Sequence, residues 1–246
     1  METEKRDTHL IMKMKESIIR NFDPEVIILF GSQGRGEADE YSDIDLLIIF
    51  DRDNDKEEIA ANISSSLDHI TKEKDIIVRS LNDYYLQCDI PGTIVFSAIK
   101  EGMFLFKKED FGKNVPDTKS HEKRKKDVIK KEYIEQAHNF LDKAESSLEK
   151  GNFFRCRDFL RFATVRVIKG LFVKENIHPP RETDLNSLLR AAIRLNPAFE
   201  EYSDFLMELN DFSPGLYGDN KRRTSREILE KTSAFVKDIT DMLLKE

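Results

Sequence analysis

The first part of the chain alternates short, wholly apolar runs with amphipathic stretches. The runs over 26–30 and 46–50 have the length and the β-branched content of buried strands, and those over 75–78 and 103–106 predict two shorter strands. Apolar residues also recur at helical spacing, which predicts helices over 8–21, 56–70, 80–87 and 91–100. This mixture indicates an α/β (α+β) domain with a small mixed sheet over residues 1–110.

The pattern changes in the second half of the chain. Residues 111–120 combine glycine, proline and charge without periodicity, as a linker does. Beyond them we expect an all-α antiparallel helical bundle over 121–246. Its expected helices span 122–150, 152–176, 184–195, 198–210 and 223–245. Five phenylalanines are expected in the bundle core, namely Phe153, Phe154, Phe159, Phe162 and Phe172.

Composition narrows the class of protein. A net charge of −7 over 246 residues argues against broad nucleic-acid binding, although a local basic patch stays open. The two cysteines, Cys88 and Cys156, lie far apart in apolar contexts, so we expect small core residues and neither a zinc site nor a disulfide framework. No apolar run reaches membrane-spanning length, and the N-terminus lacks a signal-peptide core. The expectation is a cytoplasmic protein with no membrane partner.

Two aspartates at spacing two, Asp43 and Asp45, lead into the apolar run 46–50. Side chains alternate faces along a strand, so both carboxylates project the same way. Such a pair in isolation is more often a solvated strand start, but this one stands at the mouth of a buried strand, where unpaired charge is costly. A third acid, Asp75, begins the next apolar run. If these strands are neighbours, the three carboxylates converge, and they are ligands that Mg²⁺ prefers.

Gly31 and Ser32 directly follow the first strand and open a predicted helix. A helix N-terminus presents free backbone N–H groups to a phosphate, glycine allows close approach, and a serine hydroxyl adds a donor. Arg35 lies one turn further on and can reach the same anion. For these residues alone, a plain strand–helix turn remains the alternative.

These motifs together carry a family resemblance. The segments Gly31-Ser32, Arg35-Gly36-Glu37-Ala38 and Ser42-Asp43-Ile44-Asp45-Leu46-Leu47 resemble the signature of the polymerase-β-type nucleotidyltransferases, above all the small bacterial minimal nucleotidyltransferases. Asp75-Ile76-Ile77-Val78 resembles the strand with the family's third carboxylate, and Glu101-Gly102 begins a segment similar to its closing strand. This resemblance covers residues 20–107. The helical part is similar to HEPN domains, through Ala144, Leu148, Gly151, residues 166–169, Pro179-Pro180 and the loop over 211–220.

The resemblance implies Mg²⁺-dependent nucleotidyl transfer to a hydroxyl acceptor, with release of pyrophosphate. The implied donor is a nucleoside triphosphate, with ATP expected, and two Mg²⁺ ions are implied beside it. Asp75 would also help to deprotonate the acceptor. The implied site residues fall into two sets, the metal ligands Asp43, Asp45 and Asp75 and the phosphate-binding residues Gly31, Ser32 and Arg35.

Other functions stay open at this point. The acceptor is a small molecule, a protein or an RNA end, and dimerisation through the helical domain is an expectation from the family. A non-catalytic nucleotide-binding or antitoxin-like module is the alternative, against which the three acids weigh. A HEPN ribonuclease is disfavoured, because none of the five histidines follows an arginine by four to six residues.

Overall fold

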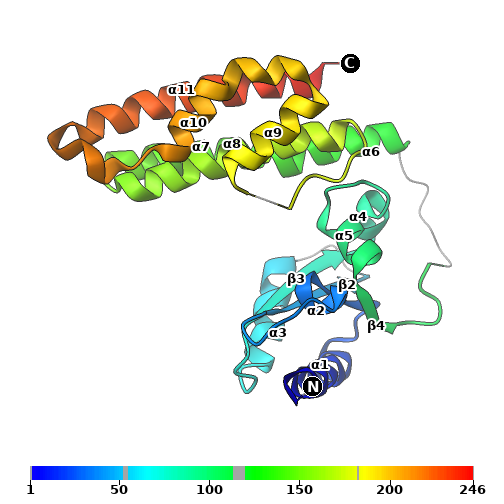
Figure 1. The fold of residues 1–246 in the computed structure, drawn as a ribbon. Helices are drawn as coiled ribbons and strands as arrows, with labels where there is room; N and C mark the ends of the chain where they lie inside the picture. The colour runs from blue at the N-terminus through cyan, green and yellow to red at the C-terminus, as the bar shows by residue number, and fades with distance from the viewer. Residues whose placement is uncertain (1, 52–54, 113–119, 182, 246) are drawn as a thin grey trace. The chain divides into compact units, whose positions relative to one another are not determined.

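The chain forms two compact units, Met1–Ser120 and His121–Glu246, each of which is described by itself. The computed structural model describes residues 2–51, 55–112, 120–181 and 183–245 (Figure 1). Most of the predicted linker over 111–120 lies outside the described residues. Phe111 at its beginning packs against the first unit, with its ring centroid 5.0 Å from that of Tyr84.

The first unit is a small sheet with helices on both faces. Its strands are β1 (Val26–Phe30), β2 (Ile44–Phe50), β3 (Lys74–Ser80) and β4 (Met103–Lys107). Its helices are α1 (Glu2–Phe22), α2 (Gly31–Arg35), α3 (Lys56–Ser66), α4 (Leu81–Gln87) and α5 (Ile94–Glu101). The four strands predicted from the apolar runs are all present, as are the helices between them.

The sheet has the order β3-β2-β1-β4. β1 pairs antiparallel with β2 and β4, while β2 and β3 are parallel, so the predicted mixed sheet is confirmed. β2 begins at Ile44, two residues before the predicted run, because Asp45 pairs in register with Phe30 of β1 and with Asp75 of β3. The predicted condition that β2 and β3 are neighbours is therefore met.

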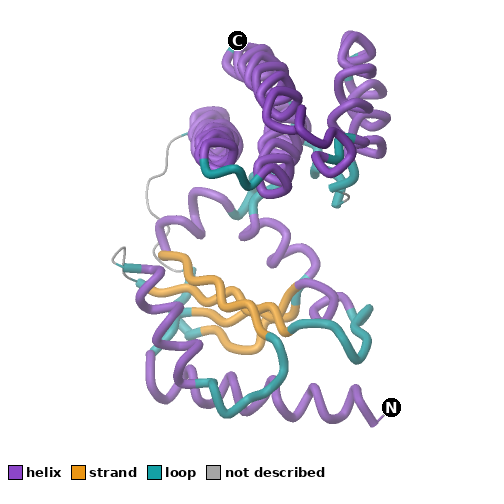
Figure 2. The backbone as a smooth tube through the Cα atoms, turned by 90° about the vertical axis from the view of Figure 1, so that its left-hand side faces the viewer, coloured by secondary structure: helices purple, strands orange, loops and turns teal. Residues whose placement is uncertain are grey.

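Each face of the sheet has its own core. Figure 2 shows the helices that lie on either side of the strands. On one face α1 and α3 pack against the sheet, through residues that include Met14, Ile18, Leu29, Leu46, Ile48 and Ile63. On the other face the core includes Ile28, Leu47, Ile49, Val95 and Ala98, with α5 and part of α4 as the covering layer. β1 and β2 are buried on both faces and therefore read as continuous apolar runs, which is why the sequence revealed them.

In its described residues the second unit consists of helices joined by turns and loops. Its long helices are α6 (His121–Val128), α7 (Gln136–Glu149), α8 (Phe153–Lys174), α9 (Leu185–Leu195), α10 (Ser203–Asp211) and α11 (Lys221–Leu244). Two 3₁₀ segments, η2 (Pro197–Tyr202) and η3 (Pro214–Asn220), precede α10 and α11. None of the helices in the described parts of the chain has both the length and the apolar content of a membrane span.

The helix predicted over 122–150 is interrupted by a π-helical stretch, η1 (Ile129–Glu135). The wider π turn carries Tyr133 against α8, where a Cβ at Gly170 would lie only 3.2 Å from the Cβ of Tyr133. Tyr133 is buried, and burial raises the pKa of its hydroxyl. The absence of a side chain at Gly170 thus makes room for the inserted turn.

The expectation that all five bundle phenylalanines lie in the core is wrong for two of them. Phe172 is buried, but Phe154 and Phe162 are 52% and 50% exposed. Phe162 contacts Phe140 and Phe159, with ring centroids 5.5 and 6.4 Å away. Helical spacing alone does not tell which stripe of a helix meets a neighbour, and here α8 carries aromatic rings on its outer face too.

We expect Leu47→Ala to destabilise the first unit. Leu47 is fully buried beside the aspartate end of β2, and truncation of such a leucine costs ~2–5 kcal/mol. Native-state hydrogen exchange of β1 and β2 peptides measures the loss. The control is Tyr41→Ala, because Tyr41 is 83% exposed. Unchanged protection in Leu47→Ala contradicts the described core.

Candidate active site

The candidate site lies at the end of β1, where the chain turns into α2. Gly31 has a φ of +64°, a conformation that side chains rarely adopt. A Cβ at this position would lie 1.9 Å from Oδ2 of Asp45. The carboxylate of Asp45 therefore packs directly against the backbone of Gly31. The structure thus brings one predicted metal ligand and one predicted phosphate-binding residue into contact.

Two of the three predicted acids, Asp45 and Asp75, lie on one face of the sheet, and the third lies just before it. Asp45 and Asp75 are register partners in the parallel pair β2–β3, and Asp43 precedes β2 by one residue. Asp45 is half-buried, while Asp43 and Asp75 are exposed. Burial raises the pKa of Asp45, the charges of Asp75 and Asp43 raise it further, and Arg35 opposes them. The carboxylate of Asp45 is thus close enough to those of Asp43 and Asp75 to be repelled by both.

The same three acids are the predicted metal ligands. Within the described residues, no group of three or more His, Cys, Asp or Glu side chains is already gathered closely enough to hold a metal. The three aspartates nevertheless offer hard oxygen donors, the type that Mg²⁺ prefers. Their mutual repulsion at Asp45 is the kind that a cation relieves. The donor set therefore fits Mg²⁺ in its chemistry.

The predicted phosphate-binding residues lie in a very short helix. α2 has five residues and ends at Gly36, which has a φ of +72°. Because so short a helix has a weak dipole, any anion binding here depends on individual donors more than on the helix as a whole. Those donors are the backbone, the hydroxyl of Ser32 and the guanidinium of Arg35.

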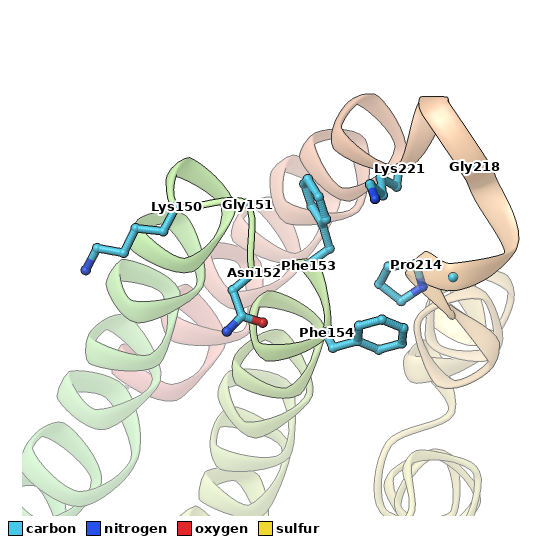
Figure 3. Close-up of a pocket in the computed structure, with 9 residues that line it drawn as sticks. Lys150, Gly151, Asn152, Phe153, Phe154, Pro214, Gly218 and Lys221 are labelled. Atoms are coloured by element: carbon cyan, nitrogen blue, oxygen red, sulfur yellow. The ribbon is translucent and has the colours of Figure 1, made fainter.

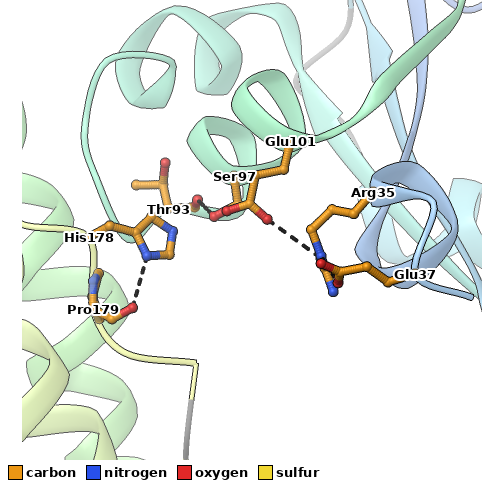
Figure 4. Close-up of polar contacts among 7 residues, drawn as sticks. All are labelled: Arg35, Glu37, Thr93, Ser97, Glu101, His178 and Pro179. Atoms are coloured by element: carbon orange, nitrogen blue, oxygen red, sulfur yellow. Dashed lines mark hydrogen bonds and ion pairs between the residues drawn. The ribbon is translucent and has the colours of Figure 1, made fainter.

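Arg35 contacts two carboxylates that the sequence interpretation did not assign to the site. Its Nε donates to Oε2 of Glu37 at 2.6 Å, and its Nη1 lies 3.5 Å from Oε2 of Glu101 (Figure 4). Glu37 follows α2, and Glu101 ends α5. The sequence signal for this arrangement is the pair of glycines, Gly34 and Gly102, each of which adjoins one partner of the Arg35–Glu101 pair.

A hollow of about 750 Å³ opens on the face of the first unit that α1 covers, away from the side chain of Asp45. It is lined by residues of α1, β1, α2, β4 and the segment after α2, including Met12, Leu29, Gln33 and Leu105. Leu29 belongs to the core on the α1 face, whereas the side chain of Asp45 projects to the other face with Leu47. The acids therefore do not point into this hollow.

The helical unit has a smaller pocket of about 370 Å³ between the α7–α8 turn and the start of α11. Lys150 and Lys221 line it together with the rings of Phe153 and Phe154 (Figure 3). Nζ of Lys221 lies 5.5 Å from the ring centroid of Phe153, so a cation already rests on an aromatic face there. In an acidic chain this is a local basic and aromatic surface.

Comparison with known protein families finds a matching family for each unit. Residues 12–111 match the family described as "Polymerase beta, Nucleotidyltransferase", and residues 131–246 match the HEPN domain. Among curated proteins none matches the chain in sequence. A solved structure of a nucleotidyltransferase-like protein from Exiguobacterium sibiricum 255-15 is similar at 10% identity and a TM-score of 0.40, over 93% of this chain and 75% of that one. The chain thus consists of a polymerase beta-type nucleotidyltransferase domain followed by a HEPN domain.

Proposed function

We propose that the first domain transfers a nucleoside monophosphate, AMP from ATP, to a hydroxyl acceptor and releases pyrophosphate. Two observations together carry the proposal. The carboxylate of Asp45 lies against the backbone of Gly31, and Asp45 pairs in register with Asp75 of the neighbouring strand. This chemistry requires carboxylates that can hold a metal ion next to groups that donate hydrogen bonds to phosphate. The proposal places the reaction in the cytoplasm, with both cysteines as free thiols.

In this proposal Asp43, Asp45 and Asp75 hold Mg²⁺. The bound metal would supply positive charge that stabilises the triphosphate and lowers the pKa of the acceptor hydroxyl. Ser32 and the Gly31 backbone donate hydrogen bonds to the β- and γ-phosphates, and the guanidinium of Arg35 donates to the same anion.

The exposed carboxylate of Asp75 accepts the proton of the acceptor hydroxyl. The acceptor oxygen then forms a bond to the α-phosphorus, while the bond from that phosphorus to the bridging oxygen of the pyrophosphate breaks. The electron pair leaves with pyrophosphate. The half-buried Asp45 is already held against Gly31, so its position needs little adjustment during the reaction.

Asp45→Asn is expected to abolish transfer and to keep the fold. The substitution removes a charged oxygen donor but also removes its repulsion with Asp43 and Asp75, so the Mg²⁺-free Tm should equal or exceed that of the unmodified protein. Transfer of label from α-labelled ATP to an acceptor, together with pyrophosphate release, measures the activity.

A second readout does not depend on activity. Mg²⁺ at 100 times its Kd stabilises a protein that binds it by about 2.7 kcal/mol, so the unmodified chain should show a Tm rise that Asp45→Asn largely loses. Full transfer in Asp45→Asn, or an equal Mg²⁺ response in both proteins, contradicts the proposed site.

Gly31→Ala is expected to lower transfer by about 100-fold, because a shift of Asp45 by about 1 Å is enough for such a loss. The new Cβ would occupy the place of Oδ2 of Asp45. Gly36→Ala is the matched control: its φ of +72° brings similar backbone strain, and its Cβ would meet no atom within 4 Å. Steady-state rates of the two variants decide the matter, and equal losses would show that backbone strain alone is responsible.

For the acceptor we propose only a broad class, namely a hydroxyl on a small molecule, a protein or an RNA end. The basic and aromatic pocket of the helical unit favours an acceptor with phosphates and bases, since lysine binds phosphate and phenylalanine stacks on bases. The antitoxin-like alternative, a module that binds nucleotide and transfers nothing, fits the HEPN domain as well. Label that stays in ATP with every fraction of a lysate supports that alternative.

We further propose a homodimer through the helical unit. Phe140, Phe159 and Phe162 form a cluster on α7 and α8, and Phe162 is half exposed. Light scattering after size exclusion should show a dimer that Phe162→Glu converts to a monomer, because a charge in an apolar interface is costly. Phe154→Glu is the control, since Phe154 is equally exposed outside the cluster. A dimer that persists in Phe162→Glu rules out this interface.

A further inference from the structure

Two glycines bring α2 and the end of α5 together without any side chain between them. A Cβ at Gly34 would lie 2.6 Å from the carbonyl oxygen of Leu29 and 3.3 Å from Cα of Gly102. A Cβ at Gly102 would lie 2.4 Å from the carbonyl oxygen of Ala98 and 2.6 Å from that of Leu29. Neither glycine has a positive φ, so both are required by space and not by conformation.

This contact decides which side chains meet. Arg35 follows Gly34 and Glu101 precedes Gly102, so the close approach of the two backbones places their side chains as an ion pair (Figure 4). The side chains of Arg35 and Glu101 are 23% and 28% exposed. Glu101 therefore interacts with the guanidinium from a fixed helix end and in partial shelter from water, where a charge pair is screened less.

Glu37 contacts the same guanidinium in a different way. It lies in the segment that follows α2, and its side chain is 59% exposed. Glu37 lies closer to Nε of Arg35 than Glu101 lies to Nη1. An exposed ion pair nevertheless contributes little free energy, so its carboxylate is readily exchanged for another anion. A phosphate can replace such a carboxylate on the guanidinium, because both accept the same forked hydrogen bonds.

Resting on the proposed function, we propose that Glu101 is a positioning residue that orients Arg35 toward the nucleotide phosphates, and that Glu37 competes with those phosphates for the guanidinium. An arginine side chain loses considerable rotamer freedom when it binds a ligand. Glu101 removes part of that freedom beforehand, which lowers the cost of binding. Glu37 adds to the cost, because its contact must break first.

The two glutamates therefore allow a paired experiment with opposite signs. Glu101→Gln should weaken binding of a non-hydrolysable ATP analogue in Mg²⁺ by about 5-fold, and Glu37→Gln should strengthen it by about 2-fold. Isothermal titration calorimetry measures both dissociation constants on the full chain. The two substitutions are chemically identical, so a general effect of lost negative charge would move both constants in the same direction.

A double-mutant cycle separates positioning from a merely structural role of Glu101. In the Arg35→Gln background, Glu101→Gln should have no further effect, because the side chain that it orients is gone. An undiminished effect of Glu101→Gln in that background overturns the proposal. If Arg35→Gln binds too weakly for calorimetry, the signs of the two single variants decide: weaker for Glu101→Gln and tighter for Glu37→Gln support it, and any other pair of signs rejects it.

Failure of this inference differs from failure of the proposed function. If the unmodified, folded protein binds the analogue and Asp45→Asn does not, the nucleotide site stands, whatever the two glutamate variants do. If the unmodified protein shows no Mg²⁺-dependent binding, the proposed function falls and the role of Glu101 falls with it. Thermal melts of each variant confirm that a changed affinity does not come from unfolding.

Discussion

The contact between the backbone of Gly31 and the carboxylate of Asp45 is the constraint on which the rest of the site depends. It holds a charged group at the end of a buried strand, half-buried and next to two further acids. A side chain at position 31 would displace that carboxylate, so the observed arrangement depends on glycine there. The strand register places Asp45 beside Asp75. The turn after β1 places it against Gly31, the residue before Ser32.

The price of this arrangement is electrostatic. Burial and two like charges act on Asp45, and Arg35 compensates only in part, because Glu37 and Glu101 also pair with its guanidinium. A rigid double-faced core around β1 and β2 keeps the acids in place despite their repulsion. The gathered carboxylates thus lower the stability of the fold at one end of the sheet, as is common where charges serve a function.

The sequence predicted the parts of this molecule that depend on local pattern. The strands β1 and β2 were visible because they are buried on both faces. The aspartate pair was visible because side chains two residues apart on a strand project to the same face. The ion pair of Arg35 with Glu101 was not predicted, since it arises from a contact between two glycines far apart in the chain. The π-helical stretch was missed because its spacing differs little from that of an α-helix over seven residues. The outward rings of Phe154 and Phe162 were missed because periodicity does not identify the neighbouring helix.

The hollow on the α1 face has a consequence for the search for ligands. It is twice as voluminous as the basic pocket of the helical unit, at about 750 against 370 Å³, yet it lies behind the sheet with respect to the aspartates. A compound selected for volume alone would settle there and leave the aspartate face uncovered. It would still touch Gln33, whose amide donates to Asp7 at 3.0 Å and which belongs to the same short helix as Ser32 and Arg35. Such a compound would lie behind the turn that carries Ser32, and its shape would follow the α1 face and not the aspartate face.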